Sequence, residues 1–317
     1  MREYILSVIF SLLSLSLMSC ASSPFKTELG KIDSDGMVLV PKGWFNMGYD
    51  EGEFNEAPEH EVFVKTFSID RYEVSAREFA AFLNEKGNPE DRYFSCDVYS
   101  TIACLDKEEK QTDKPAGGSI LYKPRPGYEN YPANNVSWFG SDGFCRWKGK
   151  RLPTEAEWEK AARGEDSRLY PWGDGLPDER TSRFGSELEK KGLDALVPVD
   201  SLPDGHSYYG LYNMAGNVVE WTNDWYRQNY CNFCDPDSED YIKTASELLG
   251  LHDAAGIDKK NPDVPPMYNS EGPPLGSFKV LRGGSWNNYS EVQLRTVYRY
   301  WLEPNERNNT TGFRCAK

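Results

Sequence analysis

Large aromatic side chains and turn-forming residues are mixed along almost the whole of this chain, and this mixture strongly restricts its fold. The sequence holds 9 Trp, 19 Tyr and 15 Phe together with 27 Gly and 20 Pro. Gly and Pro interrupt regular elements, whereas aromatic side chains supply buried area that a disordered chain lacks. We therefore expect an ordered, loop-rich fold in which large side chains supply the packing. The net charge of −14 repels phosphate backbones, so no nucleic-acid partner is expected.

The N-terminus has the pattern of a lipoprotein signal. Residues 1–19 combine a charged Arg2 with an apolar stretch and end at Ser19-Cys20, which resembles the bacterial lipobox. Cleavage there would leave Cys20 as the lipidated first residue, followed by a tether over 20–35. We expect attachment to a bacterial membrane, at the outer membrane and cell surface. An ordinary signal peptide is the alternative, and lipidation alone does not fix which side of the membrane the protein faces.

The remaining sequence is interpreted as one domain over 36–317. Short, alternating apolar segments predict strands, and Ser or Thr followed three residues later by Glu predicts helix starts. Two weakly periodic stretches, about 88–130 and 228–277, are interpreted as insertions. The predicted strands are 36–41, 60–70, 278–281 and 312–315, and the predicted helices begin after Ser75, Ser137 and Thr154.

Six cysteines remain after Cys20, which is an even number, and secretion permits disulfides. Cys231-Asn-Phe-Cys234 has the spacing of a redox motif or half of a zinc site. A zinc site needs two further ligands, and the chain has only three scattered His residues. Structural disulfides are therefore the preferred interpretation.

A series of multi-residue motifs resembles the formylglycine-generating enzyme family, whose domain is also called sulfatase-modifying. The resemblance implies an α+β fold, the C-type-lectin-like fold of the formylglycine-generating-enzyme type, which is rich in irregular structure and here carries two insertions. It also implies a disulfide between Cys145 and Cys315, while the pairing of Cys96, Cys104, Cys231 and Cys234 stays open. The motifs are Asn135-Val-Ser-Trp138, Gly149-Lys-Arg-Leu-Pro-Thr-Glu-Ala-Glu-Trp-Glu159, Tyr170-Pro-Trp-Gly173, Gly210-Leu-Tyr-Asn-Met-Ala-Gly-Asn217, Glu220-Trp221, Arg282-Gly-Gly-Ser-Trp286 and Gly312-Phe-Arg314.

The enzymes of this family bind copper through two cysteines, and the matching positions here are Asn288 and Gln293. Neither residue supplies the thiolate that Cu(I) requires. Ser285 and Arg295 match family active-site positions but do not replace the cysteines. We therefore predict a protein that is not an enzyme and that binds neither copper nor iron.

The resemblance implies a structural calcium site at Asn213, Gly216, Val218 and Glu220. Side-chain oxygens of Asn213 and Glu220 with two backbone carbonyls suit a hard cation. The alternative is a tight turn in which Glu220 is satisfied by hydrogen bonds.

Residues 286–311 mix Asn, Tyr, Trp, Arg and Ser with little apolar periodicity, a composition typical of binding surfaces. The segment resembles the variable region of diversity-generating retroelement proteins, which lies between Gly-Gly-Ser-Trp and Gly-Phe-Arg. In those proteins, mutation at template adenines converts Asn codons into codons for a restricted set of residues. Gln293 and Trp301 cannot arise from such codons. Val297 and Trp301 are expected to fill the end of the domain. The predicted ligand-binding residues are Trp286, Asn287, Asn288, Tyr289, Gln293, Tyr298, Tyr300, Leu302, Asn305, Asn308, Asn309 and Thr310.

We therefore expect a lipid-anchored, surface-displayed protein that binds an extracellular ligand, a protein or a glycan, through a hypervariable segment. Two alternatives are an oxidoreductase of the formylglycine-generating or a related type and a structural lipoprotein of the envelope. The sequence leaves the ligand and the oligomeric state open.

Overall fold

The structure, a computed structural model, describes residues 30–106, 120–186, 192–228 and 275–317, and all statements below concern these ranges. The predicted signal peptide, Cys20, and the pair Cys231 and Cys234 lie outside them. In the described ranges, no helix has the length and apolar character needed to cross a membrane.

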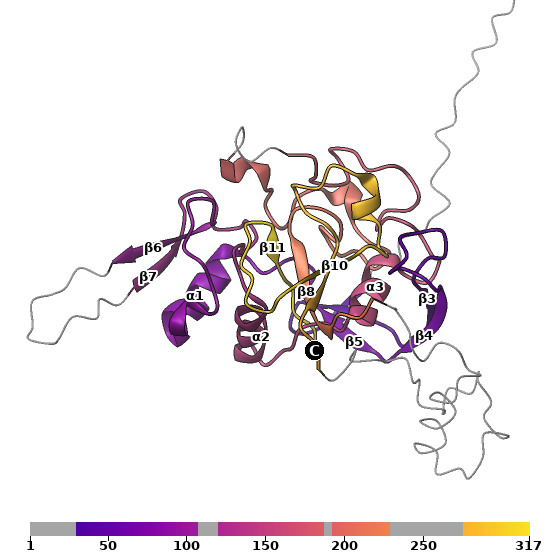
Figure 1. Ribbon diagram of the computed structural model, residues 1–317, viewed down its shortest axis with the longest axis horizontal. Coiled ribbons are helices and arrows are strands. Elements are labelled where there is room, and N and C mark those ends of the chain that lie inside the picture. Colours follow the sequence, from indigo (N-terminus) through magenta and orange to yellow (C-terminus); the bar gives the residue numbers. More distant parts are fainter. Residues whose placement is uncertain (1–29, 107–119, 187–191, 229–274) are drawn as a thin grey trace, which may run out of the picture.

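A four-stranded sheet in the order β10-β9-β8-β11 forms the centre of the molecule (Figure 1). β8 (Val219–Trp225), β9 (Lys279–Arg282) and β10 (Arg299–Leu302) are antiparallel, and β11 (Thr311–Gly312) runs parallel to β8. Every residue of β9 is buried, and β10 lies at one edge with two exposed side chains, Tyr300 and Trp301. The predicted strand 312–315 is thus shorter and begins one residue earlier.

The predicted helix starts are confirmed by side-chain caps. α1 (Ala76–Lys86) and α3 (Glu155–Arg163) begin with capping boxes, and the Ser137 side chain caps α2 (Trp138–Trp147). Each cap satisfies backbone N–H groups that a helix start leaves unpaired. α2 and α3 both contact β8, and Figure 1 shows them on either side of the central sheet.

Smaller sheets surround this centre. β1 (Lys31–Ile32), β2 (Val38–Val40) and β5 (Phe67–Ile69) form one, and β3 (Gly43–Met47) pairs with β4 (His60–Val64). The predicted strand 60–70 is therefore two strands that belong to different sheets. Short 3-10 helices occupy Pro89–Asp91, Gly192–Ala195, Pro203–Gly205 and Glu291–Leu294.

Aromatic packing builds the larger of two main cores, as the composition predicts. Phe79 of α1 has ring contacts with Phe82, Phe94, Phe144 and Phe313, at centroid distances of 5.5 to 6.2 Å. Contacts of this geometry add stability beyond the buried area alone. The second core lies between β2–β5 and α3 around the fully buried Trp158.

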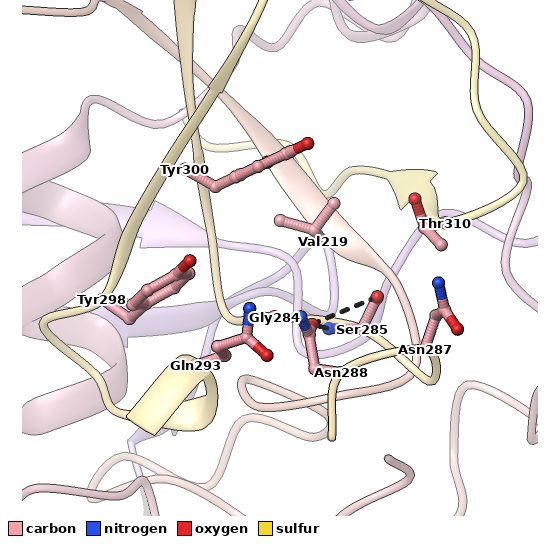
Figure 2. A pocket seen from close by; sticks show the side chains of 9 residues that line it. All are labelled: Val219, Gly284, Ser285, Asn287, Asn288, Gln293, Tyr298, Tyr300 and Thr310. Atoms are coloured by element: carbon pink, nitrogen blue, oxygen red, sulfur yellow. Dashed lines mark hydrogen bonds between the residues drawn. The ribbon is translucent and has the colours of Figure 1, made fainter. Parts of the chain in front are cut away.

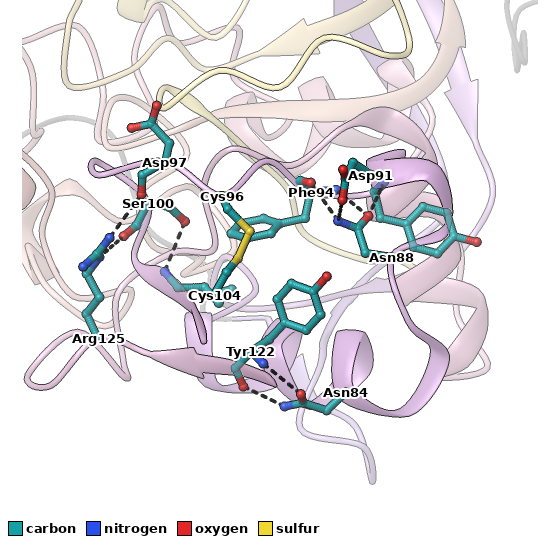
Figure 3. The surroundings of a disulfide bond; sticks show 12 residues. Asn84, Asn88, Asp91, Phe94, Cys96, Asp97, Ser100, Cys104, Tyr122 and Arg125 are labelled. Atoms are coloured by element: carbon teal, nitrogen blue, oxygen red, sulfur yellow. Dashed lines mark hydrogen bonds between the residues drawn. A yellow bond between two sulfur atoms is a disulfide. The ribbon is translucent and has the colours of Figure 1, made fainter. Parts of the chain in front are cut away.

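The first insertion is more regular than expected. It contains a hairpin of β6 (Ile102–Asp106) and β7 (Ile120–Pro124), which packs against α1. The side chain of Asn84 donates to the Tyr122 carbonyl and accepts from its N–H (Figure 3). A disulfide between Cys96 and Cys104 ties the hairpin to the chain that leads into it.

The second disulfide joins Cys145 of α2 to Cys315, the pair implied by the family resemblance. Both cysteines are fully buried in the aromatic core. The two cysteines are 170 positions apart in the sequence, so the bond closes a long loop. It also fixes the C-terminal segment on α2.

Candidate functional site

A polar pocket of about 190 Å³ opens where the turn after β9 meets β10 and the residue before β11 (Figure 2). The turn, η5 (Glu291–Leu294) and β10 all belong to the segment that the sequence singles out as a binding region. The pocket is lined by Val219, Gly284, Ser285, Asn287, Asn288, Gln293, Tyr298, Tyr300 and Thr310.

The structure gathers part of the predicted ligand-binding set in this pocket, namely Asn287, Asn288, Gln293, Tyr298, Tyr300 and Thr310. The other predicted residues lie elsewhere. Trp286 is 2% exposed and belongs to a core cluster, and Leu302 packs against the aromatic core. Tyr289, Asn305, Asn308 and Asn309 do not line the pocket.

Three lining residues were not predicted to bind. Val219 is the first residue of β8, a strand that was not among the predicted ones. Gly284 has a φ of 67° and a Cβ there would lie 2.4 Å from the Gln293 carbonyl oxygen, so a side chain at this position would displace η5. Ser285 was noted only as a match to a family position, and that match was the available signal.

The pocket lining contains no charged side chain. The Asn288 side-chain oxygen accepts from the backbone N–H and the hydroxyl of Ser285, at 2.5 and 3.2 Å. Among the described residues, the side chains of Asn287, Gln293 and Thr310 have no hydrogen-bond partner, and neither do the two tyrosine hydroxyls. Uncharged donors and acceptors therefore converge on one space, and most of them are free to bond to solvent or to a ligand.

Tyr300 stays protonated at neutral pH. Burial raises the pKa of its phenol, and the neighbouring Tyr298 and the negative charge of Glu306 raise it further. The hydroxyl can thus both donate and accept a hydrogen bond.

Buried ion pairs hold the pocket from beneath. Arg282 of β9 pairs with Glu159 of α3 and donates to the carbonyls of Val297 and Tyr298, each at 2.8 Å. Arg299 makes two hydrogen bonds to the carboxylate of Glu155. These contacts fix the main chain just before β10 and do not involve the pocket side chains.

The segment that follows β10 is also held through its main chain. The carbonyl of Pro304 accepts from the N–H of Trp138, and the carbonyl of Asn308 from the N–H of Asn135. The carbonyl of Asn309 accepts from the side chains of Asn134 and Trp286. The side chains of Asn308 and Asn309 are therefore not needed to hold the segment in place.

Trp301 does not fill the end of the domain, because it is 36% exposed and its ring stacks on Tyr226 with 4.3 Å between centroids. It follows Tyr300 on the edge strand, and the centroids of the two rings lie 6.3 Å apart. Val297 is fully buried, as expected.

The predicted calcium residues lie on the turn into β8. Asn213 has a φ of 52° and Gly216 a φ of 82°. The carboxylate of Glu220 already accepts hydrogen bonds from Arg314, at 2.6 and 2.7 Å, and from the Trp158 indole at 2.8 Å.

The remaining calcium ligands are in part available. The amide nitrogen of Asn213 donates to Glu73 and Val199, which directs its oxygen elsewhere, and Val218 is buried in a core cluster. The set fits calcium only if Glu220 is shared with Arg314. Calcium therefore stays a prediction, and no step below depends on it.

Glu73 adds an unpaired buried acid beside this turn. Burial and the charge of Glu220 raise its pKa to about 8, although the amides of Asn213 and Asn217 donate to it. The turn and the adjacent α1 start thus carry a pH-sensitive group that sequence reasoning did not identify.

The positions that the resemblance assigns to copper cysteines, Asn288 and Gln293, both line the pocket. No group of three or more His, Cys, Asp or Glu side chains suited to a metal ion occurs in the described ranges. The pocket thus coincides with the position at which the family resemblance places a copper site.

The comparisons with known proteins extend over most of the chain. The model of the sulfatase-modifying factor enzyme 1-like domain matches residues 24–317. A formylglycine-generating enzyme of Thermomonospora curvata is 33% identical over 89% of this chain and 93% of its own length. A protein of Chlamydia caviae named serine/threonine-protein kinase pkn1 is 32% identical over 89% of this chain, but the match spans only 38% of that relative.

These relatives overturn the prediction that the chain is not an enzyme. Formylglycine-generating enzymes from Bos taurus, Thermomonospora curvata and Streptomyces coelicolor are among them, although a relative 34% identical is named an inactive C-alpha-formylglycine-generating enzyme 2. The prediction rested mainly on Asn288 and Gln293. Two substituted positions speak against one copper-dependent route and not against catalysis as a class.

The solved structure of Treponema denticola variable protein 1 has a TM-score of 0.56 and 21% identity, covering 88% of this chain and 94% of that one. This similarity confirms the expected fold, which formylglycine-generating enzymes and variable proteins share. The chain therefore belongs to the family of sulfatase-modifying factor enzyme 1-like domains.

Proposed function

We propose that the protein binds an extracellular ligand through the pocket lined by Gly284, Ser285, Asn287, Asn288, Gln293, Tyr298, Tyr300 and Thr310. The observation that carries this proposal is the convergence on one cavity of uncharged polar side chains, most of which make no hydrogen bond to the rest of the described protein. Polar side chains that converge on a cavity and remain free to bond to a ligand are typical of a binding site.

The main-chain contacts that hold the segment after β10 support the proposal that its side chains vary between copies of the protein. Contacts to Pro304, Asn308 and Asn309 use main-chain carbonyls, which any side chain leaves in place. Replacement of the side chains would therefore change the ligand surface and preserve the scaffold. Sequencing codons 286–311 across isolates tests this idea. Changes confined to template-adenine positions, beside a near-copy repeat and a reverse transcriptase, would support it, and an invariant segment would contradict it.

We further propose that Cys20 carries a lipid and displays the domain at the cell surface. The Leu17-Met18-Ser19-Cys20 motif supports the lipid, and the surface position follows from the proposed ligand. Labelled palmitate should be incorporated into the wild-type protein but not into Cys20→Ser. The Cys20→Ser variant should also be absent from the membrane fraction. Proteolysis of intact cells should remove the domain; protection of the domain would place it in the periplasm.

The binding proposal is tested by screening the full-length protein against a peptide-display library and a glycan array. The variant Gln293→Ala/Tyr298→Phe/Tyr300→Phe should lose the ligands found. Tyr289→Phe is the matched control, because this exposed tyrosine lies outside the pocket. Ligands that bind the triple variant as well as the wild type would refute the pocket as the site.

A second candidate is catalysis of the family's kind. Its support is the family membership and the coincidence of the pocket with the positions of the copper cysteines. It requires a cofactor site that differs from a cysteine pair. It predicts copper or iron in the purified protein and turnover of a cysteine-containing peptide, and metal-free protein without turnover would refute it.

A further inference from the structure

The pocket has room for one small ring and no provision for a charge. Its volume of about 190 Å³ is below the roughly 300–1,000 Å³ of sites for drug-sized ligands. A charged group that entered would lose its hydration without meeting a counter-charge in the lining. The exposed Glu303 and Glu306 follow β10, and the charge of Glu306 reaches Tyr300, so anions are disfavoured further.

The functional groups in the pocket match a polyhydroxylated ring. Gln293 and Asn287 offer amides that both donate and accept, and Thr310 and the two tyrosines offer hydroxyls. Tyr298 and Tyr300 are two residues apart in extended chain, so both side chains lie on the same face, as Figure 2 shows. Such a lining suits hydroxyl groups around a ring and leaves aromatic surface for its C–H face.

The aromatic surface continues outside the pocket. Trp301 stacks on Tyr226, whose hydroxyl accepts from Asn55 at 3.1 Å and whose ring lies 5.0 Å from the Arg299 guanidinium. One face of the indole is thus fixed on a supported ring while the side chain remains 36% exposed. The Trp301 and Tyr300 ring centroids are 6.3 Å apart, which brings this platform to the edge of the pocket.

We infer that the ligand is an uncharged oligosaccharide, with one sugar ring in the pocket and the next stacked on Trp301. This inference rests on the proposed binding function and names the ligand of the same site. Tyr298 and Tyr300 recognise the inserted ring through their hydroxyls. Trp301 contributes by stacking to the adjacent sugar.

The test uses the full-length protein and an array of hexose and N-acetylhexosamine oligosaccharides. The same oligosaccharides with sialic acid, sulfate or uronic acid ends provide the charged comparison. Neutral ligands should bind, and the charged forms should bind about tenfold more weakly or not at all. Trp301→Ala should weaken ligands of two or more rings about tenfold and leave single sugars unchanged, whereas Tyr298→Phe/Tyr300→Phe should weaken both.

The outcomes separate this inference from the proposed function. Peptide ligands that depend on Gln293, Tyr298 and Tyr300, with no glycan bound, would overturn the sugar and keep the binding site. Equal affinity for charged and neutral glycans would overturn the neutral class. A protein that bound no probe of either library would overturn the binding function itself.

Discussion

Loss of the disulfide between Cys145 and Cys315 should destabilise the protein far more than loss of the one between Cys96 and Cys104. A disulfide stabilises mainly by lowering the entropy of the unfolded chain, and the effect grows with the closed loop. The separations are 170 and 8 residues. The loop-entropy relation then gives about 5 kcal/mol for the long loop and about 2.5 kcal/mol for the short one at 25 °C.

Burial increases the difference. Cys145 and Cys315 are fully buried in the aromatic core, whereas Cys96 is exposed. Because domains are stable by only about 5–15 kcal/mol, Cys145→Ala/Cys315→Ala should leave little folded protein at 37 °C. Cys96→Ala/Cys104→Ala should fold and unfold at a lower urea concentration than the wild type.

Equilibrium urea unfolding, followed by the fluorescence of the buried Trp158 and Trp221, measures both double variants under non-reducing conditions. Equal losses of free energy, or a larger loss for the short loop, would refute the reasoning. Such a result would mean that the unfolded chain is already compact around the long loop.

Further predictions concern the pocket, the buried acid, the buried ion pair and calcium. Tyr298→Phe/Tyr300→Phe should weaken ligand binding and change stability by under about 0.5 kcal/mol per site, since neither hydroxyl has an internal partner. Glu73 has a pKa of about 8 in the folded protein, against the ordinary value of 4.5 in the unfolded chain. Between these two pH values the folded protein therefore holds a proton that the unfolded chain has released. Stability should therefore fall by up to about 1.4 kcal/mol per pH unit between these values, and Glu73→Gln should remove this slope. Arg314→Met should cost about 3–5 kcal/mol, because the fully buried carboxylate of Glu220 loses its cation. Calcium at one hundred times its dissociation constant should raise the free energy of unfolding by about 2.7 kcal/mol, and EDTA should reverse this.

Each of these predictions has an opposing result. A collapse of stability in the double tyrosine variant would make the rings part of the core. An unchanged pH slope in Glu73→Gln would locate the titrating group elsewhere. Wild-type stability of Arg314→Met would mean that the other contacts of the Glu220 carboxylate compensate for the lost cation. A melting temperature that changes with neither calcium nor EDTA would mean that the turn before β8 is a simple tight turn without a bound ion.

Local signals predicted the helices well. The starts at Ser75, Ser137 and Thr154 follow from side-chain caps that involve residues a few positions apart. Strands depend on distant partners, and here prediction was weaker. β8 is buried on both faces and shows no alternation, so its sequence resembled the turns before it.

The candidate site was predicted as a segment and not as a pocket. Composition and the flanking motifs identified 286–311, but they did not separate the residues that line the cavity from those that support it. Trp286, which was predicted to bind a ligand, lies in the core, and Trp301, which was expected to be buried, lies on the surface. The exposure of Trp301 depends on Tyr226, a contact between residues far apart in sequence.

The sequence by itself determined the family, the helix starts, the aromatic character of the core and the segment that carries the site, because each is encoded in neighbouring residues or in recognisable motifs. Only the tertiary structure decided which of those side chains converge. The pocket joins Val219 of a central strand to residues 284–310, and its lack of charge and its unused hydrogen bonds exist only once β8, β10 and η5 meet. Such properties belong to a space between elements, and no single stretch of the chain contains that space.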